Sequence, residues 1–324
     1  MASILIQKLK KRGTIKMKSL NKNIAEYIEY CTYRKRLDSK TLKAYRIDLN
    51  QYVAFCAGRK DCFGKRVVDD FITGLHKCYK PKTVRRKIAS LKAFFHHLEY
   101  RELLTENPFA KLDIRFREAK LLPKTIPFHS IQTFLSTMYA QKSATESDYQ
   151  FRSCVRDIAV VELLFATGMR ISELCSLKPS DIDLESGNIL IYGKGARERI
   201  IQIGNREVID VLTLYQEAFK NDIATCGYFF VNRLRRKLSD QSVRFMINRY
   251  ARLSGIGQHI TPHMFRHSFA TLLLEQDVDI RYIQRMLGHS SISTTEIYTH
   301  VSNAKQKDIL LHKHPRNLME MDKG

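Results

Sequence analysis

Several hallmarks of common protein classes are missing from this 324-residue sequence. No apolar run approaches the roughly 18 residues that a membrane span needs. Residues 1–20 also lack the apolar stretch and small-residue cleavage site of a secretory signal. The seven cysteines include no Cys-x-x-Cys pair, which argues against a disulfide framework or a zinc ribbon. We therefore expect a soluble, cytoplasmic protein with free thiols and no membrane partner.

Acidic residues are scarce beside basic ones. The chain has 33 Asp and Glu against 55 Lys and Arg, a formal charge of +22. Residues 1–118 carry +16 of this charge, and residues 119–324 carry +6. The excess suits a nucleic-acid partner, because each neutralised phosphate releases condensed counterions. Charge alone would equally suit an anionic membrane surface, ribosomal RNA or simple solubility.

The length suggests about two domains, since domains average roughly 100–200 residues. Apolar residues three and four positions apart predict a small all-α domain over residues 21–112. A polar, proline-containing stretch over 113–127 predicts a linker, because a residue before proline favours an extended backbone. Residues 128–311 are predicted to form a larger domain, and a basic extension (1–20) and a tail (312–324) lie at the two ends.

The larger domain is predicted to be mostly helical. Residues 188–192 and 199–203 flank a glycine-containing turn and predict two strands, with a third at 182–184. The polar stretch 141–150 is expected to be a loop or a partner surface. Helical periodicity is found at 129–140, 154–167, 170–177, 205–220, 240–253, 262–275, 279–287 and 293–301. The predicted fold class is therefore mainly α, with a small three-stranded antiparallel sheet in the C-terminal domain.

Pro81 opens a predicted helix of the first domain that has one apolar stripe and one basic face. The stripe includes Val84, Ile88 and Leu91. The basic side chains that lie off it are Lys80, Lys82, Arg85, Arg86 and Lys92. This pattern predicts a helix that faces a core on one side and a polyanion on the other.

Four short segments of the larger domain collect polar residues that a core would not require. They are ATGMRISEL (166–174), GKGARER (193–199), TPHMFRHSF (261–269) and LGHSSISTTEIYTH (287–300). Taken singly, each has an ordinary explanation, such as a surface ion pair, an exposed hairpin turn or a helix cap. Taken together and in this order, they supply cationic donors, an acid or base and a nucleophile, which are the components of phosphoryl transfer.

The third segment opens a predicted helix, with Thr261 at the N-cap and Pro262 at the first helical position. His263 and Arg266 then share one helix face at i, i+3. Free backbone N–H groups and the helix dipole favour a phosphate at this end of a helix.

The other three segments each contribute a candidate. Arg170 follows a Thr-Gly break after an apolar helix, and Glu173 is spaced to hold its guanidinium. Lys194 lies between two glycines of the predicted hairpin turn, where the backbone can approach a ligand closely. His289 follows a glycine at a helix end, and Tyr298 lies in a helix that a Ser-x-x-Glu capping box starts.

These segments resemble those of the tyrosine recombinase (phage integrase) family, most closely its Xer-like members. The motifs that carry the resemblance are ATGMRISEL, HMFRHSFATLLLE, MLGHSSISTTEIYTHV and, nearer the N-terminus, YRIDLNQYVAF. The resemblance covers most of residues 21–311. It implies a site-specific recombinase with an N-terminal core-binding domain, a C-terminal catalytic domain, and no metal or other cofactor.

The resemblance also implies a role for each candidate. The two arginines would clamp the scissile phosphate, the lysine would protonate the departing 5′-hydroxyl, and the histidines would assist proton transfer and contact the phosphate. The tyrosine would attack the phosphorus and form a 3′-phosphotyrosyl link, and Glu173 would support the site. The implied catalytic residues are Arg170, Lys194, His263, Arg266, His289 and Tyr298.

The implied partner is double-stranded DNA, enclosed by the two domains. Family members act as a dimer on each site and a homotetramer on two sites and pass through a Holliday junction. Whether accessory recombination proteins take part is left open by the sequence. Chromosome dimer resolution, transposon movement and phage integration all remain open as the biological task. The tail after Tyr298 could pack on its own protomer or on a neighbour.

Three alternative functions fit part of the pattern. His263 and His267 have the i, i+4 spacing of a zinc helix, with His289 as a third ligand, but Met264 stands where the HExxH motif requires glutamate. A noncatalytic DNA-binding regulator suits the charge distribution equally well. A type IB topoisomerase would share the chemistry and relax one duplex instead of exchanging two.

Overall fold

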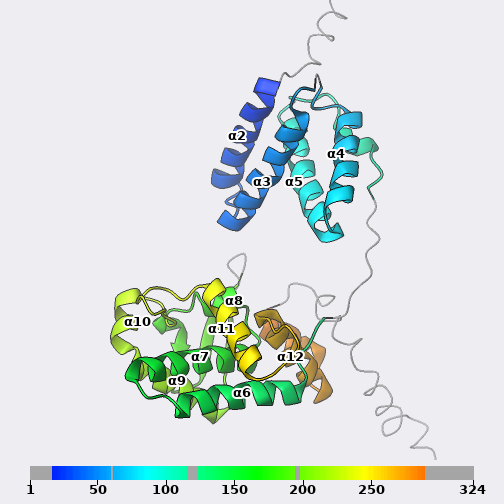
Figure 1. Cartoon of the computed structure of the whole chain (residues 1–324). Helices are drawn as coiled ribbons and strands as arrows, with labels where there is room; N and C mark the ends of the chain where they lie inside the picture. Colours follow the sequence, from blue (N-terminus) through cyan, green and yellow to red (C-terminus); the bar gives the residue numbers. More distant parts are fainter. Residues whose placement is uncertain (1–16, 60, 115–122, 194–197, 289–324) are drawn as a thin grey trace, which may run out of the picture. The chain divides into compact units, whose positions relative to one another are not determined.

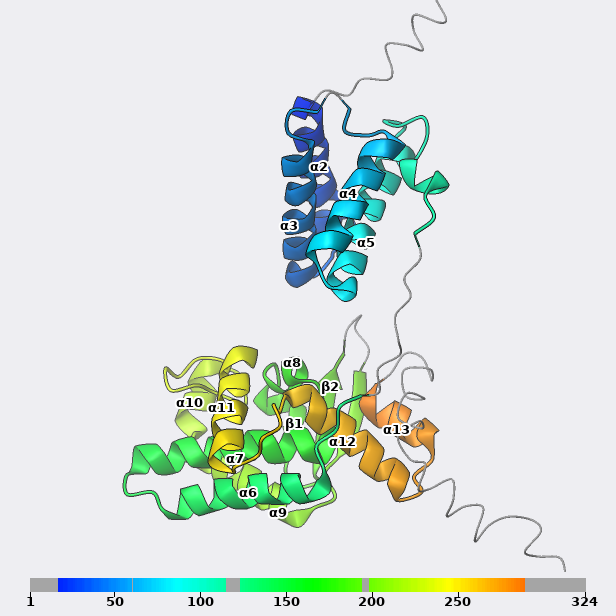
Figure 2. The same ribbon diagram turned by 45° about the vertical axis from the view of Figure 1, so that its right-hand side comes forward.

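The structure is a computed structural model that describes residues 17–59, 61–114, 123–193 and 198–288. The chain divides into two compact units, Met1–Lys120 and Leu121–Gly324. Helices dominate the described part of both units (Figures 1 and 2). Within that part, no helix is both long and apolar enough to cross a bilayer.

The described part of the N-terminal unit is a helical bundle. Its elements are α2 (Met17–Tyr33), α3 (Ser39–Cys56), α4 (Lys65–Cys78), α5 (Pro81–Tyr100) and the 3-10 turn η1 (Pro108–Lys111). Pro81 occupies the first turn of α5, as the sequence predicted. The apolar stripe of α5 is buried, and Phe94 packs edge-to-face on Phe95 with ring centroids 5.8 Å apart.

A buried carboxylate joins two helices of this bundle. Asp48 on α3 is 3 % exposed. Lys87 on α5 donates to its Oδ1 at 3.0 Å, and Ser90 donates to its Oδ2 at 2.9 Å. Arg86 also pairs with this carboxylate. Because an unpaired buried charge is costly, this network favours one alignment of α3 against α5.

The C-terminal unit is organised around one central helix, of which the second half is buried. In chain order its helices are α6 (Phe128–Ser143), α7 (Asp148–Thr167), α8 (Ile171–Leu174), the 3-10 turn η2 (Pro179–Asp181), α9 (Arg206–Ala218), α10 (Lys220–Cys226), α11 (Asp240–Leu253), α12 (Pro262–Glu275) and α13 (Ile280–Leu287). α6, α9, α11 and α12 all pack on α7 (Figure 2). The buried residues of α7 run from Val155 to Thr167 and are mostly apolar, as expected of a helix segment that is covered on several sides.

A small sheet accompanies these helices. β1 (Ile182–Asp183), β2 (Asn188–Tyr192) and β3 (Glu198–Gln202) form an antiparallel sheet in the order β1-β2-β3. Ile189 pairs with Ile201, and both side chains are buried in the core. The predicted fold class is confirmed.

Three details of the predicted elements were wrong. The stretch 141–150 is a loop only at residues 144–147, because α6 runs to Ser143 and the Ser147 side chain caps α7 by accepting the Gln150 N–H. That it is a partner surface stays a prediction. The helix expected at 170–177 is the single turn α8. The helix expected at 205–220 ends at Ala218, and α10 follows it. The helix predicted at 293–301 lies outside the described residues.

Candidate active site

Gly168 makes the turn that presents Arg170. It ends α7 with a left-handed backbone, at a φ of +57°. A Cβ there would lie 2.6 Å from Phe269 Cδ1 and 2.9 Å from Leu287 Cδ2, so the turn requires glycine for both its backbone and its space. The chain then places Arg170 at the start of α8 with its side chain 37 % exposed.

Glu173 holds Arg170, as the sequence predicted. Its Oε1 accepts from Arg170 Nη1 at 2.9 Å, and its Oε2 accepts from the Arg170 backbone N–H at 2.8 Å. Burial would raise the pKa of Glu173, but hydrogen bonds and charge from Arg199 and Arg170 outweigh burial and leave the pKa below its ordinary value. Glu173 is therefore a fixed anion at neutral pH.

Arg199 on β3 is a further member of the site that was not predicted from the sequence. Its Nη1 and Nη2 donate to Oε1 and Oε2 of Glu173 at 3.1 and 2.7 Å. Its Nε donates to the Met286 carbonyl oxygen at 2.9 Å, near the end of α13. The sequence did single out the segment GKGARER for its polar residues, and Arg199 is the last residue of that segment.

Arg266 on α12 is buried, with 4 % of its surface exposed. Its Nη1 donates to the carbonyl oxygen of Gly168 at 2.7 Å, and its Nη2 donates to that of Leu287 at 2.7 Å. One guanidinium therefore joins the C-terminal ends of α7 and α13, and it binds the turn that leads directly into Arg170.

His263 lies one helical turn before Arg266 and is exposed. Thr261 and Pro262 hold the predicted N-cap and first helical positions, although the Thr261 side chain makes no cap hydrogen bond. Burial, together with the nearby charges of His263 and Arg266, lowers the pKa of His267 to about 4. His267 is therefore neutral at neutral pH.

The remaining predicted catalytic residues are Lys194, His289 and Tyr298, and all three lie outside the described residues. The described chain stops at Gly193 before the first of them and at Gly288 before the second. Gly288 caps α13 with a φ of +64°, and a Cβ there would lie 3.0 Å from Arg199 Nη1. Lys194 and His289 thus directly follow described residues in the chain.

The predicted DNA-facing residues of the N-terminal unit are all solvent-exposed on or beside α5. They are Lys80, Lys82, Arg85, Arg86 and Lys92. Arg86 also contacts Asp48, so its guanidinium has a fixed anchor.

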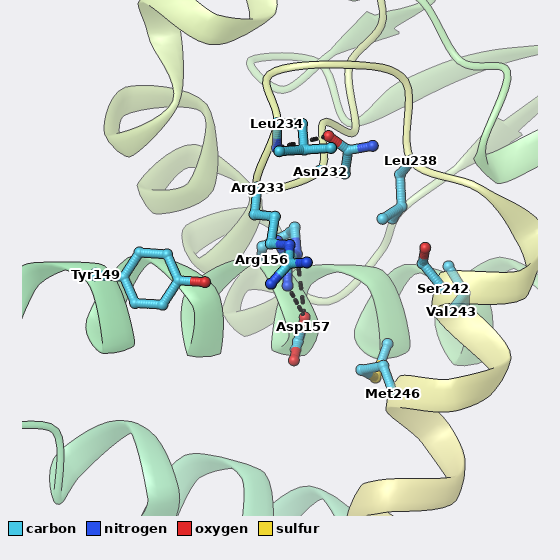
Figure 3. A pocket seen from close by; sticks show the side chains of 10 residues that line it. All are labelled: Tyr149, Arg156, Asp157, Asn232, Arg233, Leu234, Leu238, Ser242, Val243 and Met246. Carbon is cyan, nitrogen blue, oxygen red and sulfur yellow. Dashed lines mark hydrogen bonds and ion pairs between the residues drawn. The ribbon is translucent and has the colours of Figure 1, made fainter.

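A pocket of about 270 Å³ lies elsewhere in the C-terminal unit, between α7, α11 and the loop before α11 (Figure 3). In its lining, Asp157 pairs with Arg156 at 2.8 Å, and Arg249, which lies outside the lining, pairs with the same carboxylate at 3.0 Å. None of the described candidate catalytic residues lines it. Across the described residues, no group of three or more His, Cys, Asp or Glu side chains is arranged to hold a metal ion.

Comparison with known proteins defines the class. The chain is 58% identical over 301 residues to a tyrosine recombinase of Agathobacter rectalis, covering 93% of this chain and 98% of that protein. It is 34% identical over 307 residues to tyrosine recombinase XerD of Listeria innocua, covering 92% and 100%. The alternatives of a regulator or a topoisomerase are not favoured by these relatives.

The family follows from the domain models. The phage integrase family model matches residues 127–305, and a phage integrase N-terminal SAM-like domain matches residues 21–105. The chain belongs to the phage integrase family, and it is a site-specific recombinase. Its fold also resembles the crystal structure of XerH recombinase bound to palindromic difH substrate, with a TM-score of 0.68 at 20% identity, over 88% of this chain and 83% of that one.

Proposed function

We propose that this recombinase cleaves and rejoins double-stranded DNA through Tyr298. The tyrosine oxygen attacks the scissile phosphorus, the bond to the 5′-oxygen breaks, and the 5′-oxygen leaves as a hydroxyl after taking up a proton. The phosphate stays joined to Tyr298 as a 3′-phosphotyrosyl ester. A 5′-hydroxyl from a second duplex then displaces the tyrosine, so the reaction needs no ATP and no cofactor.

The observation that carries this proposal is the gathering of Arg170, Arg199 and Arg266 around Glu173 and the ends of α7 and α13. These side chains leave a net positive charge where the predicted nucleophile segment begins. Arg170 and Arg266 would donate to the nonbridging oxygens of the phosphate, and these bonds strengthen as the transition state gains charge.

Proton transfer falls to other groups in this proposal. His263 assists proton removal from Tyr298, Lys194 protonates the leaving 5′-oxygen, and His289 adds a phosphate contact. Guanidinium groups cannot serve here, because they do not lose a proton in proteins.

The N-terminal unit would hold the duplex. We assign residues 21–112 to DNA binding, 113–127 to a linker and 128–311 to catalysis, with the extension 1–20 and the tail 312–324 outside both domains. The exposed cations on α5 suit backbone phosphates. The family resemblance supports a dimer on each site, a homotetramer on two sites, and a Holliday-junction intermediate.

A covalent-trapping experiment tests the nucleophile. A duplex is first recovered by binding-site selection from genomic fragments and is nicked beside the cleavage point so that religation fails. Protein and duplex are mixed, denatured in detergent and separated by size. We expect a protein–DNA adduct with the wild type and none with Tyr298→Phe. Equal adduct from both proteins would contradict the assignment.

A further inference from the structure

Arg199 occupies the junction of three segments of the proposed active site. It lies on β3 with a side chain that is only 11 % exposed. Its Nη1 and Nη2 donate to the two carboxylate oxygens of Glu173, and its Nε donates to the Met286 carbonyl oxygen. The same guanidinium lies 3.0 Å from the position that a Gly288 Cβ would take. It therefore links β3, α8 and the C-terminal end of α13.

The contact between Arg199 and Glu173 affects how strongly Glu173 pairs with Arg170. Glu173 carries one negative charge and faces two guanidiniums, those of Arg170 and Arg199. Arg199 makes the bidentate pair, whereas the Arg170 side chain reaches Glu173 through one nitrogen, Nη1. A bidentate guanidinium–carboxylate pair is stronger than a single hydrogen bond, so Arg199 is the main partner of the Glu173 carboxylate. Without Arg199, the Glu173 carboxylate would pair with the guanidinium of Arg170 alone.

We propose that Arg199 is a positioning residue of this recombinase. It neutralises Glu173 so that Arg170 remains available to the scissile phosphate, and it clamps the Met286–Gly288 turn that precedes His289. The proposal rests on the proposed function of Arg170. Arg199 itself acts through Glu173 and the turn.

Cleavage of the nicked duplex by Arg199→Met is the first measurement. Misplacement of a catalytic group by about 1 Å costs roughly 100-fold in rate, so we expect a loss of that order in single-turnover cleavage. DNA affinity should change by less than about threefold, because Arg199 acts on Arg170 and not on the duplex as a whole. Arg206→Met is the matched control, because Arg206 is exposed on α9 and, among the described residues, pairs with Asp210 one helical turn away at 3.0 Å. This variant should cleave like wild type.

A second-site variant separates positioning from simple structural support. In Arg199→Met with Glu173→Gln, the carboxylate charge that captures Arg170 is gone, so we expect cleavage at least tenfold faster than in Arg199→Met alone. If Arg199 served only to hold the fold, removing Glu173 as well would slow cleavage further. A double variant slower than the single variant would therefore overturn the proposal.

A methylphosphonate at the scissile position gives an independent readout. It removes one phosphate charge, so cleavage should depend much less on Arg170. The ratio of wild-type to Arg199→Met rates should then shrink at least tenfold, whereas a folding defect would keep the ratio unchanged. If Arg199→Met does not fold by circular dichroism, Arg199→Lys replaces it. Lysine cannot make the two-point contact, so a wild-type rate for Arg199→Lys would overturn the proposal.

Arg170→Ala distinguishes this inference from the function on which it rests. If Arg170→Ala cleaves the nicked duplex normally, the phosphate role of Arg170 fails and the positioning role of Arg199 fails with it. If Arg170→Ala is inactive and Arg199→Met cleaves at the wild-type rate, only the role of Arg199 is refuted.

Discussion

Arg266 on α12 donates a hydrogen bond of 2.7 Å to the carbonyl oxygen of Gly168, the residue that ends α7. The two residues are 98 positions apart in the sequence. The bond fixes the turn that leads into Arg170, and the second bond of Arg266, to Leu287, fixes the end of α13 in the same way. A side chain proposed to bind phosphate thus also sets the backbone positions of its neighbours.

Gly168→Ala should destabilise the C-terminal unit more than the same change at a glycine with open space. Gly255 also has a left-handed backbone, with a φ of +67°, but a Cβ there meets nothing within 4 Å. Gly255→Ala should therefore cost only the backbone term of about 1 kcal/mol. Gly168→Ala adds the clash with Phe269 and should cost about 1–3 kcal/mol more. Urea unfolding measures both, and equal losses would contradict the packing argument.

The exposed cations of α5 should govern the salt dependence of DNA binding. Changing Lys82, Arg85 and Lys92 together to Gln should make the slope of log affinity against log salt shallower, by about 0.9 for each phosphate that is no longer neutralised. The matched control removes three exposed cations of α4 in the same unit, Lys65, Arg66 and Lys77. Fluorescence anisotropy at several salt concentrations gives both slopes. Equal slopes for the two triple variants would contradict the role of α5.

Lys194→Ala should lose cleavage of ordinary DNA and recover it on a modified substrate. If Lys194 protonates the leaving 5′-oxygen, its loss should slow cleavage by roughly 100- to 10,000-fold. A duplex with sulfur in place of that oxygen needs no acid, because a thiolate is a good leaving group. The variant should cleave this duplex at nearly the wild-type rate. A defect that persists with sulfur would assign Lys194 a different role.

The stability of the C-terminal unit should fall as the pH drops from about 6.5 towards 4. The unfolded chain gains a proton at His267 near its ordinary pKa of about 6.5, whereas the folded chain resists it, because burial lowers the pKa to about 4. Protons then favour the unfolded state across this window. His267→Gln should lose less stability than wild type between about pH 7 and about pH 5, as measured by urea unfolding. Exposed His129→Gln is the control and should behave like wild type.

Local patterns in the sequence predicted the parts of the site that local geometry creates. The pairing of Arg170 with Glu173 follows from i, i+3 spacing, and the start of α12 follows from Thr261 and Pro262. The fold class could be predicted for the same reason, since helical and strand periods are properties of short windows.

Contacts between distant segments could not be predicted in this way. Arg199 meets Glu173 across 26 positions, through a strand pairing whose tertiary packing no local pattern encodes. Asp48 pairs with Lys87 across 39 positions. The amphipathic pattern of the helix that carries Asp48 therefore could not predict that this carboxylate is buried. The end of the helix at Ala218 was also missed, because the helical period continues into α10.

The saturation of Glu173 determines what a pH–rate profile of cleavage can report. Its two oxygens accept hydrogen bonds from three N–H groups of side chains and one of the backbone. It is therefore held as an anion, and its arginine partners keep their protons at every working pH. This cluster supplies a constant field and exchanges no protons with the substrate. Any inflection near neutral pH must then come from residues outside the cluster, which makes the profile a direct assay of the proton-transfer groups alone.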